Sequence, residues 1–123
     1  MKTQKFLICE HCKNIVGVIA DSGVAISCCG EPMKELVALE GASAEKHTPV
    51  VSVSGNTVTI EVPHPMSSAH LIEWIYLKTN MGGHRKALTD SSEPKAVFKL
   101  AEGEKAEQAF AYCNLHGLWN TKI

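Results

Sequence analysis

The chain has 123 residues and a formal net charge of −1 at pH 7, with acidic and basic residues interspersed. That length allows one ordinary domain, or a small sandwich with an appendage. The charge pattern lacks the basic stripe of nucleic-acid-binding proteins, so we expect no nucleic-acid partner. No apolar run approaches the ~20 residues that span a bilayer, and the basic N-terminus has too short an apolar run for a secretory signal. We therefore expect a cytoplasmic protein without a membrane partner.

Four of the five cysteines lie close together near the N-terminus: Cys9, Cys12, Cys28 and Cys29. In a reducing compartment this pattern favours metal ligation over disulfides. Residues 15–19 are expected to form a strand, residues 21–23 a turn, and residues 24–26 the returning strand. That hairpin would bring the second cysteine pair back to the first, so that four thiolates could surround one ion.

So small a unit buries too little apolar surface to fold unaided, and the metal would act as its core. The adjacent pair Cys28-Cys29 differs from the second C-x2-C knuckle of a zinc ribbon, and neighbouring ligands reach tetrahedral angles only with strain. Four thiolates nevertheless remain compatible with a structural zinc ion. A Cys28–Cys29 disulfide with a second bridge is the other alternative.

Residues 40–44, Glu-Gly-Ala-Ser-Ala, are small and are expected to form a flexible linker. Beyond them the sequence becomes strongly β. Apolar residues between Val51 and Val62 alternate with polar ones on both sides of Gly55-Asn56. This alternation predicts a hairpin with one buried and one solvated face.

Further strands are expected over residues 70–77, 96–100 and 106–112. In the first of these, Ile72, Trp74 and Tyr76 are expected to share the face of His70. Residues 105–111 contain Ala, Glu and Gln and could also form a helix, but we expect mostly strand. Short strands separated by turn signals predict a small antiparallel β-sandwich.

A second set of candidate ligands is associated with these strands. In Cys113-Asn114-Leu115-His116-Gly117, a thiolate and an imidazole three positions apart can turn toward one point. Three more histidines stand at strand edges, which makes five candidates: His47, His64, His70, Cys113 and His116. Five ligands exceed the four of a structural zinc site and suit a redox metal with one open position. His84 lacks this context and is expected to be an exposed loop residue.

Four segments together resemble the iron site of superoxide reductases: Glu45-Lys46-His47, His64-Pro65-Met66, His70 with Ile72-Glu73-Trp74-Ile75, and Cys113 to Gly117. The cysteine-rich N-terminal segment resembles the additional iron domain of the two-iron form, desulfoferrodoxin. This resemblance covers essentially the whole chain. It implies a mainly β protein with a desulforedoxin-like four-cysteine iron domain at residues 1–39 and an immunoglobulin-like sandwich at residues 40–123. It departs from the family at Lys13, where a Gly is common.

The resemblance also implies an activity: reduction of superoxide to hydrogen peroxide, without dioxygen production, at an iron ringed by four imidazoles. Cys113 would lie on the axis of that iron and donate electron density to it, opposite an open position. Lys46 would attract the anionic substrate and help protonate the product. Glu45 would reach the oxidised iron when no substrate is bound. A rubredoxin-like electron donor and a homodimer are implied as well.

Two other functions remain compatible with the sequence. One is a non-enzymatic electron-transfer protein that uses both irons as relays, and the other is a zinc-ribbon interaction module on a β-sandwich. The five-ligand site has no use in the zinc module. Peroxide formation on mixing the reduced protein with superoxide would distinguish the enzyme from the relay.

Overall fold

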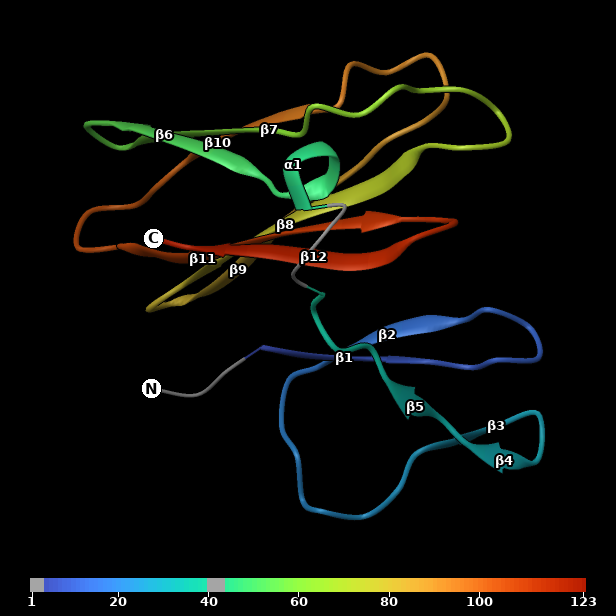
Figure 1. Ribbon diagram of the computed structural model, residues 1–123. Coiled ribbons are helices and arrows are strands. Elements are labelled where there is room, and N and C mark those ends of the chain that lie inside the picture. The colour runs from blue at the N-terminus through green and yellow to red at the C-terminus, as the bar shows by residue number, and fades with distance from the viewer. Residues whose placement is uncertain (1–3, 40–43) are drawn as a thin grey trace. The chain divides into compact units, whose positions relative to one another are not determined.

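The computed structural model describes residues 4–39 and 44–123, except for the side chains of residues 44 and 45. Most of the expected linker, residues 40–43, therefore lies outside the described residues. The chain divides into two compact units, Met1–Val37 and Ala38–Ile123, and each is described by itself. Both consist mainly of β-strands (Figure 1), which confirms the expected fold class. Among the residues that the structure describes, no helix is long and apolar enough to cross a membrane.

The first unit contains a three-stranded antiparallel sheet and a small hairpin. In the sheet, β1 (Lys5–Ile8) lies between β2 (Ile15–Val18) and β5 (Lys34–Glu35). In the hairpin, β3 (Ser27–Cys28) pairs with β4 (Glu31–Pro32). Among the described residues of this unit, the buried apolar side chains are those of Phe6 and Cys9. The unit therefore has very little hydrophobic core.

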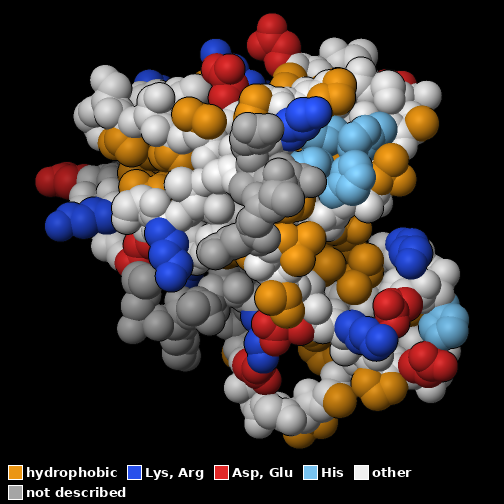
Figure 2. All heavy atoms as spheres, viewed as in Figure 1, with side chains coloured by type: hydrophobic (Ala, Val, Ile, Leu, Met, Phe, Trp, Pro, Cys, Tyr) orange, Lys and Arg blue, Asp and Glu red, His pale blue; other side chains and the backbone are white. Residues whose placement is uncertain are grey.

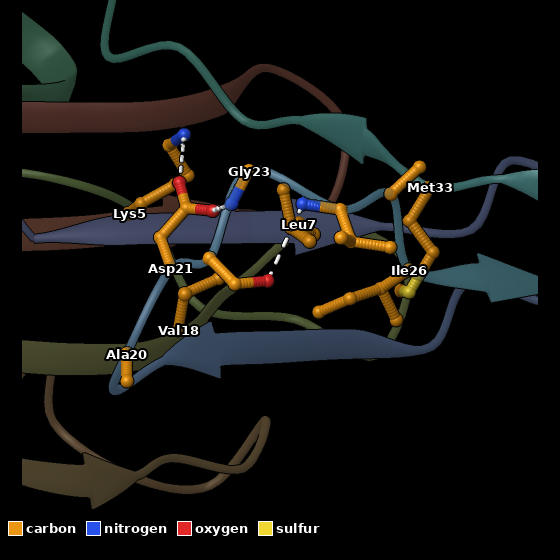
Figure 3. Close-up of a pocket in the computed structure, with 11 residues that line it drawn as sticks. Lys5, Leu7, Val18, Ala20, Asp21, Gly23, Ile26 and Met33 are labelled. Carbon is orange, nitrogen blue, oxygen red and sulfur yellow. Dashed lines mark hydrogen bonds and ion pairs between the residues drawn. The ribbon is translucent and has the colours of Figure 1, made fainter.

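The expectation of a returning strand at residues 24–26 is wrong. β2 pairs with β1, the strand before it, so the segment after β2 remains a loop. The loop bends near Gly23, whose N–H donates to the Asp21 carboxylate at 2.8 Å, and Asp21 also pairs with Lys5 at 2.8 Å (Figure 3). Val24 and Ile26 stay exposed and line an open hollow of about 300 Å³. Because β2 pairs with an earlier strand, the loop that follows it leaves these two apolar side chains largely exposed.

The second unit is an antiparallel sandwich of two sheets, as the sequence predicts. The three-stranded sheet has the order β10-β7-β6, with β6 (Val50–Ser54), β7 (Thr57–Glu61) and β10 (Lys95–Lys99). The four-stranded sheet has the order β12-β11-β8-β9, with β8 (Ile72–Thr79), β9 (Gly82–Ala87), β11 (Ala106–Cys113) and β12 (Gly117–Lys122). One short helix, α1 (Ala44–His47), precedes β6. The segment that could have been a helix is thus the strand β11.

The core of the sandwich forms where the inner faces of the two sheets meet. The three-stranded sheet contributes Val58, Ile60 and Phe98, and the four-stranded sheet contributes smaller and branched residues around Ala111 and Cys113. The predicted hairpin turn at Gly55-Asn56 joins β6 to β7. Cys113 is fully buried in this core at the end of β11. The fold therefore fixes one candidate ligand by packing alone.

The expectation that Ile72, Trp74 and Tyr76 share one face is wrong. Ile75 and Leu77 join Ile72 in the core instead. The cause is a bulge: the register with β11 shifts between Tyr112 and Cys113, so β8 has one extra residue there. An extra residue reverses the alternation of side chains along a strand. Trp74 consequently lies on the other face, where it stacks on Tyr112 with ring centroids 5.5 Å apart.

In the second unit the sequence analysis missed two of the described strands, β9 and β12, and His84 lies on the first of them. The Gly82-Gly83 pair resembles a loop signal, yet both glycines belong to β9. His84 is half-buried and its Nε2 lies 2.9 Å from the Glu104 carboxylate, so the expectation of an exposed loop residue is wrong. Glu104 also accepts hydrogen bonds from the Thr79 hydroxyl at 2.6 Å and the Ala101 N–H at 3.0 Å. These hydrogen bonds lower the pKa of Glu104 to about 2, and the bond from Thr79 has the largest effect.

Candidate metal centres

Two groups of side chains bring metal-ligating atoms together. Within each group, one ligand atom per residue lies within 4.8 Å of those of all the others. The cysteine group consists of Cys9, Cys12, Cys28 and Cys29, and the histidine–cysteine group of His47, His64, His70, Cys113 and His116. The expectation of two metal-holding groups, one of four cysteines and one of four histidines with a cysteine, is confirmed.

The first cysteine pair lies in the turn between β1 and β2. Lys13 N–H donates to the Cys9 carbonyl at 2.8 Å, and Cys9 N–H donates to the Asn14 carbonyl at 2.9 Å. Lys13 has a φ of +66°, in the left-handed region that glycine occupies without strain. The turn therefore forms with Lys13 in place of the family's Gly, at a conformational cost.

The second cysteine pair lies in the tight hairpin of β3 and β4. Cys28 pairs with Glu31, so Cys29 and Gly30 form a two-residue turn, and both have positive φ, +53° and +77°. Two successive residues with positive φ are typical of a type I′ hairpin turn. One cysteine thus ends a strand and the other begins the turn, which lets adjacent residues present both sulfurs to one point.

The sulfur spacing fits a tetrahedral metal ion. The Sγ atoms of Cys12 and Cys28 are 3.6 Å apart, close to the ~3.8 Å expected for metal–sulfur bonds of ~2.3 Å. Backbone N–H groups, first that of Cys12, lower the pKa of Cys9 to about 6, while hydrogen bonds with the neighbouring thiols raise the pKa of Cys29 to about 12. Four crowded thiols cannot all ionise unless a cation lies between them. Asn14, which the sequence analysis overlooked, also lies within 3.7 Å of the Cys28 sulfur.

The histidine–cysteine group draws its members from the end of α1, the loop between β7 and β8, and the turn between β11 and β12. Its four imidazoles form a closed ring. Ring centroids are 5.0 Å apart for His47–His64, 4.4 Å for His64–His70, 4.9 Å for His70–His116 and 4.9 Å for His116–His47. Each imidazole thus neighbours two others, as the corners of a square do.

The distances between nitrogen atoms identify the candidate donor atoms. His64 Nε2 lies 3.0 Å from His70 Nε2, and His47 Nε2 lies 3.2 Å from His116 Nδ1. Four nitrogens at ~2.1 Å from a central metal have neighbours ~3.0 Å apart when they form a square. Cys113 Sγ lies 3.5 Å from His64 Nε2 and 3.7 Å from His116 Nδ1, as a fifth donor off the plane would. The donor set therefore fits one metal ion with four imidazoles and one thiolate.

Contacts with the rest of the protein orient these rings. His64 Nδ1 lies 2.6 Å from the Pro65 carbonyl, which requires a proton on Nδ1 and leaves the Nε2 lone pair free for a metal. Trp119 stacks on His47 with centroids 4.7 Å apart and donates from Nε1 to the His116 carbonyl at 3.1 Å. Burial is the main cause that lowers the pKa of His64 and of His70, and a lowered pKa favours the neutral imidazole that a metal requires.

The group has a buried side and a solvent side. Cys113 is fully buried, whereas His116 and Lys46 are exposed. Figure 2 shows a patch of histidine side chains at the surface with a basic side chain beside it. His47 and His64 are buried and His70 is half-buried, so the group reaches solvent through His116. The side chain of Glu45 lies outside the described residues, so its expected role is not placed.

Fold and donor sets together define a β-sandwich metalloprotein with a separate cysteine-rich unit. The protein-family model described as Desulfoferrodoxin matches residues 40–122, and the chain belongs to this family. It is 42% identical to a desulfoferrodoxin of Nitratidesulfovibrio vulgaris over 93% of this chain and 92% of the relative. It is 32% identical to a superoxide reductase of Pyrococcus horikoshii over 74% of this chain and 96% of the relative. The crystal structure of the superoxide reductase from Treponema pallidum superposes with a TM-score of 0.82 at 31% identity, covering 98% of each chain.

Proposed function

We propose that the protein is a superoxide reductase whose reaction takes place at the histidine–cysteine group. The observation that carries this proposal is the closed ring of four imidazoles beside a buried thiolate, with one member of the ring, His116, exposed to solvent. A site with five protein donors and one accessible face suits a metal that binds a small ligand. The family relationship supports iron as that metal, and superoxide reductases among the relatives support the substrate.

We assign the nine cysteines and histidines of the two groups as ligands of two irons. Iron(II), when bound in the histidine–cysteine group, supplies the one electron that superoxide needs. The thiolate of Cys113 donates electron density from the buried side, which favours that transfer. Trp119 and the Pro65 carbonyl hold His47 and His64 in their orientations. The four cysteines leave no donor position open, so their centre passes electrons or holds structure.

Lys46 is the group that we expect to act on the substrate from the solvent side. It directly precedes His47 in α1 and is exposed. Its ammonium can attract the superoxide anion and, directly or through water, supply one of the two protons that peroxide formation requires. We retain Glu45 as the residue expected to reach the oxidised iron between turnovers.

We further propose a rubredoxin-like electron donor, a homodimer and a cytoplasmic location. The family relationship supports the first two, and five free cysteines suit a reducing compartment. The strands at the sheet edges, among them β6 and β9, could pair with a second copy. Light scattering of the purified protein tests the dimer, and reduction kinetics with a rubredoxin test the donor.

The function is tested by mixing the reduced protein with a pulse of superoxide and measuring peroxide and dioxygen. The wild-type protein should form peroxide without dioxygen. Cys113→Ser should lower the rate of peroxide formation by more than ~100-fold, since even indirect partners of a metal ligand are worth 10–100-fold. Cys28→Ser, which removes a thiolate from the other group, is the matched control and should react normally. A wild-type protein that is not oxidised by superoxide would instead be an electron relay, and zinc in both groups would indicate the interaction module.

A further inference from the structure

The loop between β7 and β8 carries two of the candidate ligands, His64 and His70, without support from a strand. Residues 62–71 are all described and none lies in a strand, so no β-ladder holds them. Within the loop, the backbone N–H and carbonyl of His70 bond to the backbone of Ser67 at 3.3 and 3.0 Å. These bonds shape the loop locally but do not attach it to the sandwich.

Val62 N–H donates to the Pro94 carbonyl at 2.9 Å and Met66 packs against the core, which attaches the first part of the loop. Asn114 attaches its last part, around His70. Its side-chain Oδ1 accepts from Leu71 N–H at 3.0 Å, and its Nδ2 donates to the Ala69 carbonyl at 3.0 Å. Its backbone N–H also donates to the Leu71 carbonyl, at 3.2 Å. The three bonds hold the chain on both sides of His70. Because Asn114 directly follows Cys113, they join the loop to the most deeply buried of the candidate ligands.

The same pattern of three bonds occurs a second time, at the far end of β8. Asn80 Oδ1 accepts from Lys105 N–H at 2.7 Å, and its Nδ2 donates to the Gly103 carbonyl at 3.1 Å. Its backbone N–H donates to the Lys105 carbonyl at 3.1 Å. This asparagine therefore holds both sides of Glu104 as Asn114 holds both sides of His70. We call each set of three bonds an asparagine clip. Of these two clips in the described part of the chain, the one at Asn80 lies at the end of β8 away from the candidate ligands.

We propose that Asn114 is a positioning residue of the histidine–cysteine centre, which keeps the His70 nitrogen at a fixed place relative to the Cys113 sulfur. This inference rests on the proposed roles of His70 and Cys113 as ligands. Without the clip, residues 69–71 lose their attachment to β11, and His70 becomes the imidazole that leaves the metal most readily. Partners that orient a ligand are typically worth 10–100-fold in metal affinity or activity. The clip at Asn80 contributes to folding alone.

The test compares iron-loaded, full-length Asn114→Ala and Asn80→Ala with the wild-type protein. Three properties are measured: the rate of iron release from the histidine–cysteine centre to an Fe(II) chelator, the sulfur-to-iron charge-transfer band of the oxidised protein, and the unfolding midpoint. Both variants should lower the midpoint. Asn114→Ala alone should release this iron at least ~10-fold faster and shift the band. Asn114→Asp keeps the acceptor for Leu71 N–H but loses the donor to Ala69, so it should fall between Asn114→Ala and the wild type.

The proposal is overturned if iron release is unchanged in Asn114→Ala, or if both asparagine variants accelerate it equally. Should Asn114→Ala fail to fold, Asn114→Asp is compared with Asn80→Asp by the same criterion. His70→Ala separates this inference from the proposed function. If His70→Ala accelerates iron release and the Asn114 variants do not, the clip has no role at the metal. If His70→Ala also leaves release unchanged, the proposed ligand set is wrong, and the inference falls with it.

Discussion

The two candidate metal centres differ in how much folded protein supports them. In the cysteine group, Cys12 and Cys29 are exposed and Cys28 is half-buried. They lie in turns and in a strand of two residues, within a unit whose buried apolar side chains, among its described residues, are those of Phe6 and Cys9. In the histidine–cysteine group, Cys113 ends an eight-residue strand and belongs to the main hydrophobic core.

This difference indicates opposite relations between metal and protein. A unit with so little core gains its folding free energy from the metal, as small metal-binding domains do. Apart from Cys113, the core of the sandwich consists of residues that are not candidate ligands, so it can hold the imidazoles in place before a metal arrives. In the first unit the metal organises the chain, and in the second the chain organises the site.

Metal removal should produce the largest difference between the two units. Treatment with a strong chelator should unfold residues 4–37, because the ~10–16 kcal/mol typical of structural metal binding is then lost from the folding of that unit. Strands β7, β8 and β11 should stay folded. Amide hydrogen exchange, read separately for the two units, measures both outcomes.

Cys28→Ser is the selective form of the same experiment. It should abolish the visible absorption of the four-thiolate centre and loosen the first unit, while the reaction with superoxide stays near normal. Equal loss of protection in both units after chelation would show that the sandwich also depends on its metal, and the comparison would then be wrong.

Substituting Lys46 should affect only the histidine–cysteine centre. Lys46→Ala removes a positive charge from the solvent side of that centre, and we expect a ~10-fold slower encounter with superoxide. The decrease of the rate with ionic strength should also flatten, because charges are screened over ~8–10 Å at ordinary salt. Stopped-flow kinetics at several salt concentrations measure both effects.

The matched control is Lys99→Ala. Lys99 pairs with Thr57 at the start of β7, whereas His64 follows the end of that strand. It should leave the encounter rate and its salt dependence unchanged. If Lys46→Ala behaves like Lys99→Ala, Lys46 does not steer the substrate.

The candidate ligands could be proposed from the sequence because few residue types bind metals. Cys9 and Cys12, or Cys113 and His116, are close enough in sequence for a single turn to bring their side chains together. The sandwich was predictable too, since alternation between Val51 and Val62 follows directly from one buried face. The roles of these residues as ligands remain predictions, but the structure brings the nine candidates into the two expected groups.

What could not be predicted depends on pairing between distant segments. Residues 24–26 have the sequence of a strand, but they could form one with β2 only if β2 paired with them, and β2 pairs with β1. The bulge in β8 is an effect of its register with β11, which no local pattern reveals. Nothing in the sequence around Asn114 and Asn80 shows that their side chains bond to backbone groups 43 and 25 positions away.

The stability of the sandwich should depend on pH through Glu104, which lies between β10 and β11 and bonds to Thr79 at the end of β8. Its pKa in the folded protein is about 2, below the 4.5 of an unperturbed glutamate. A depressed carboxyl pKa stabilises the fold above pH 4.5, and this contribution is lost as pH falls from about 4.5 toward 2. Glu104→Gln should therefore lower the unfolding midpoint modestly at pH 7, and the gap to the wild type should narrow below pH 4.5.

The difference between wild type and variant is the useful quantity, because the effects of acid on the rest of the sandwich are common to both proteins. Thermal unfolding of the second unit between pH 7 and pH 3 provides it. A gap that stays constant across this range would mean that Glu104 contributes through its shape and packing rather than its charge.

The smallest expected effect is in the first unit, where Lys13 has a φ of +66°. A left-handed conformation costs a non-glycine residue ~1–2 kcal/mol. Gly removes this cost, but it loses more conformational entropy on folding, which offsets part of the gain. Lys13→Gly should therefore raise the free energy of unfolding of this unit by up to ~1 kcal/mol. This free energy is measured from the loss of the four-thiolate absorption with increasing denaturant. Lys13→Ala removes the same side chain without relieving the backbone and should give no gain, while the β-branched Lys13→Val should be worse. If Gly and Ala variants are equally stable, backbone strain at Lys13 is not what limits this turn, and the metal alone sets its stability.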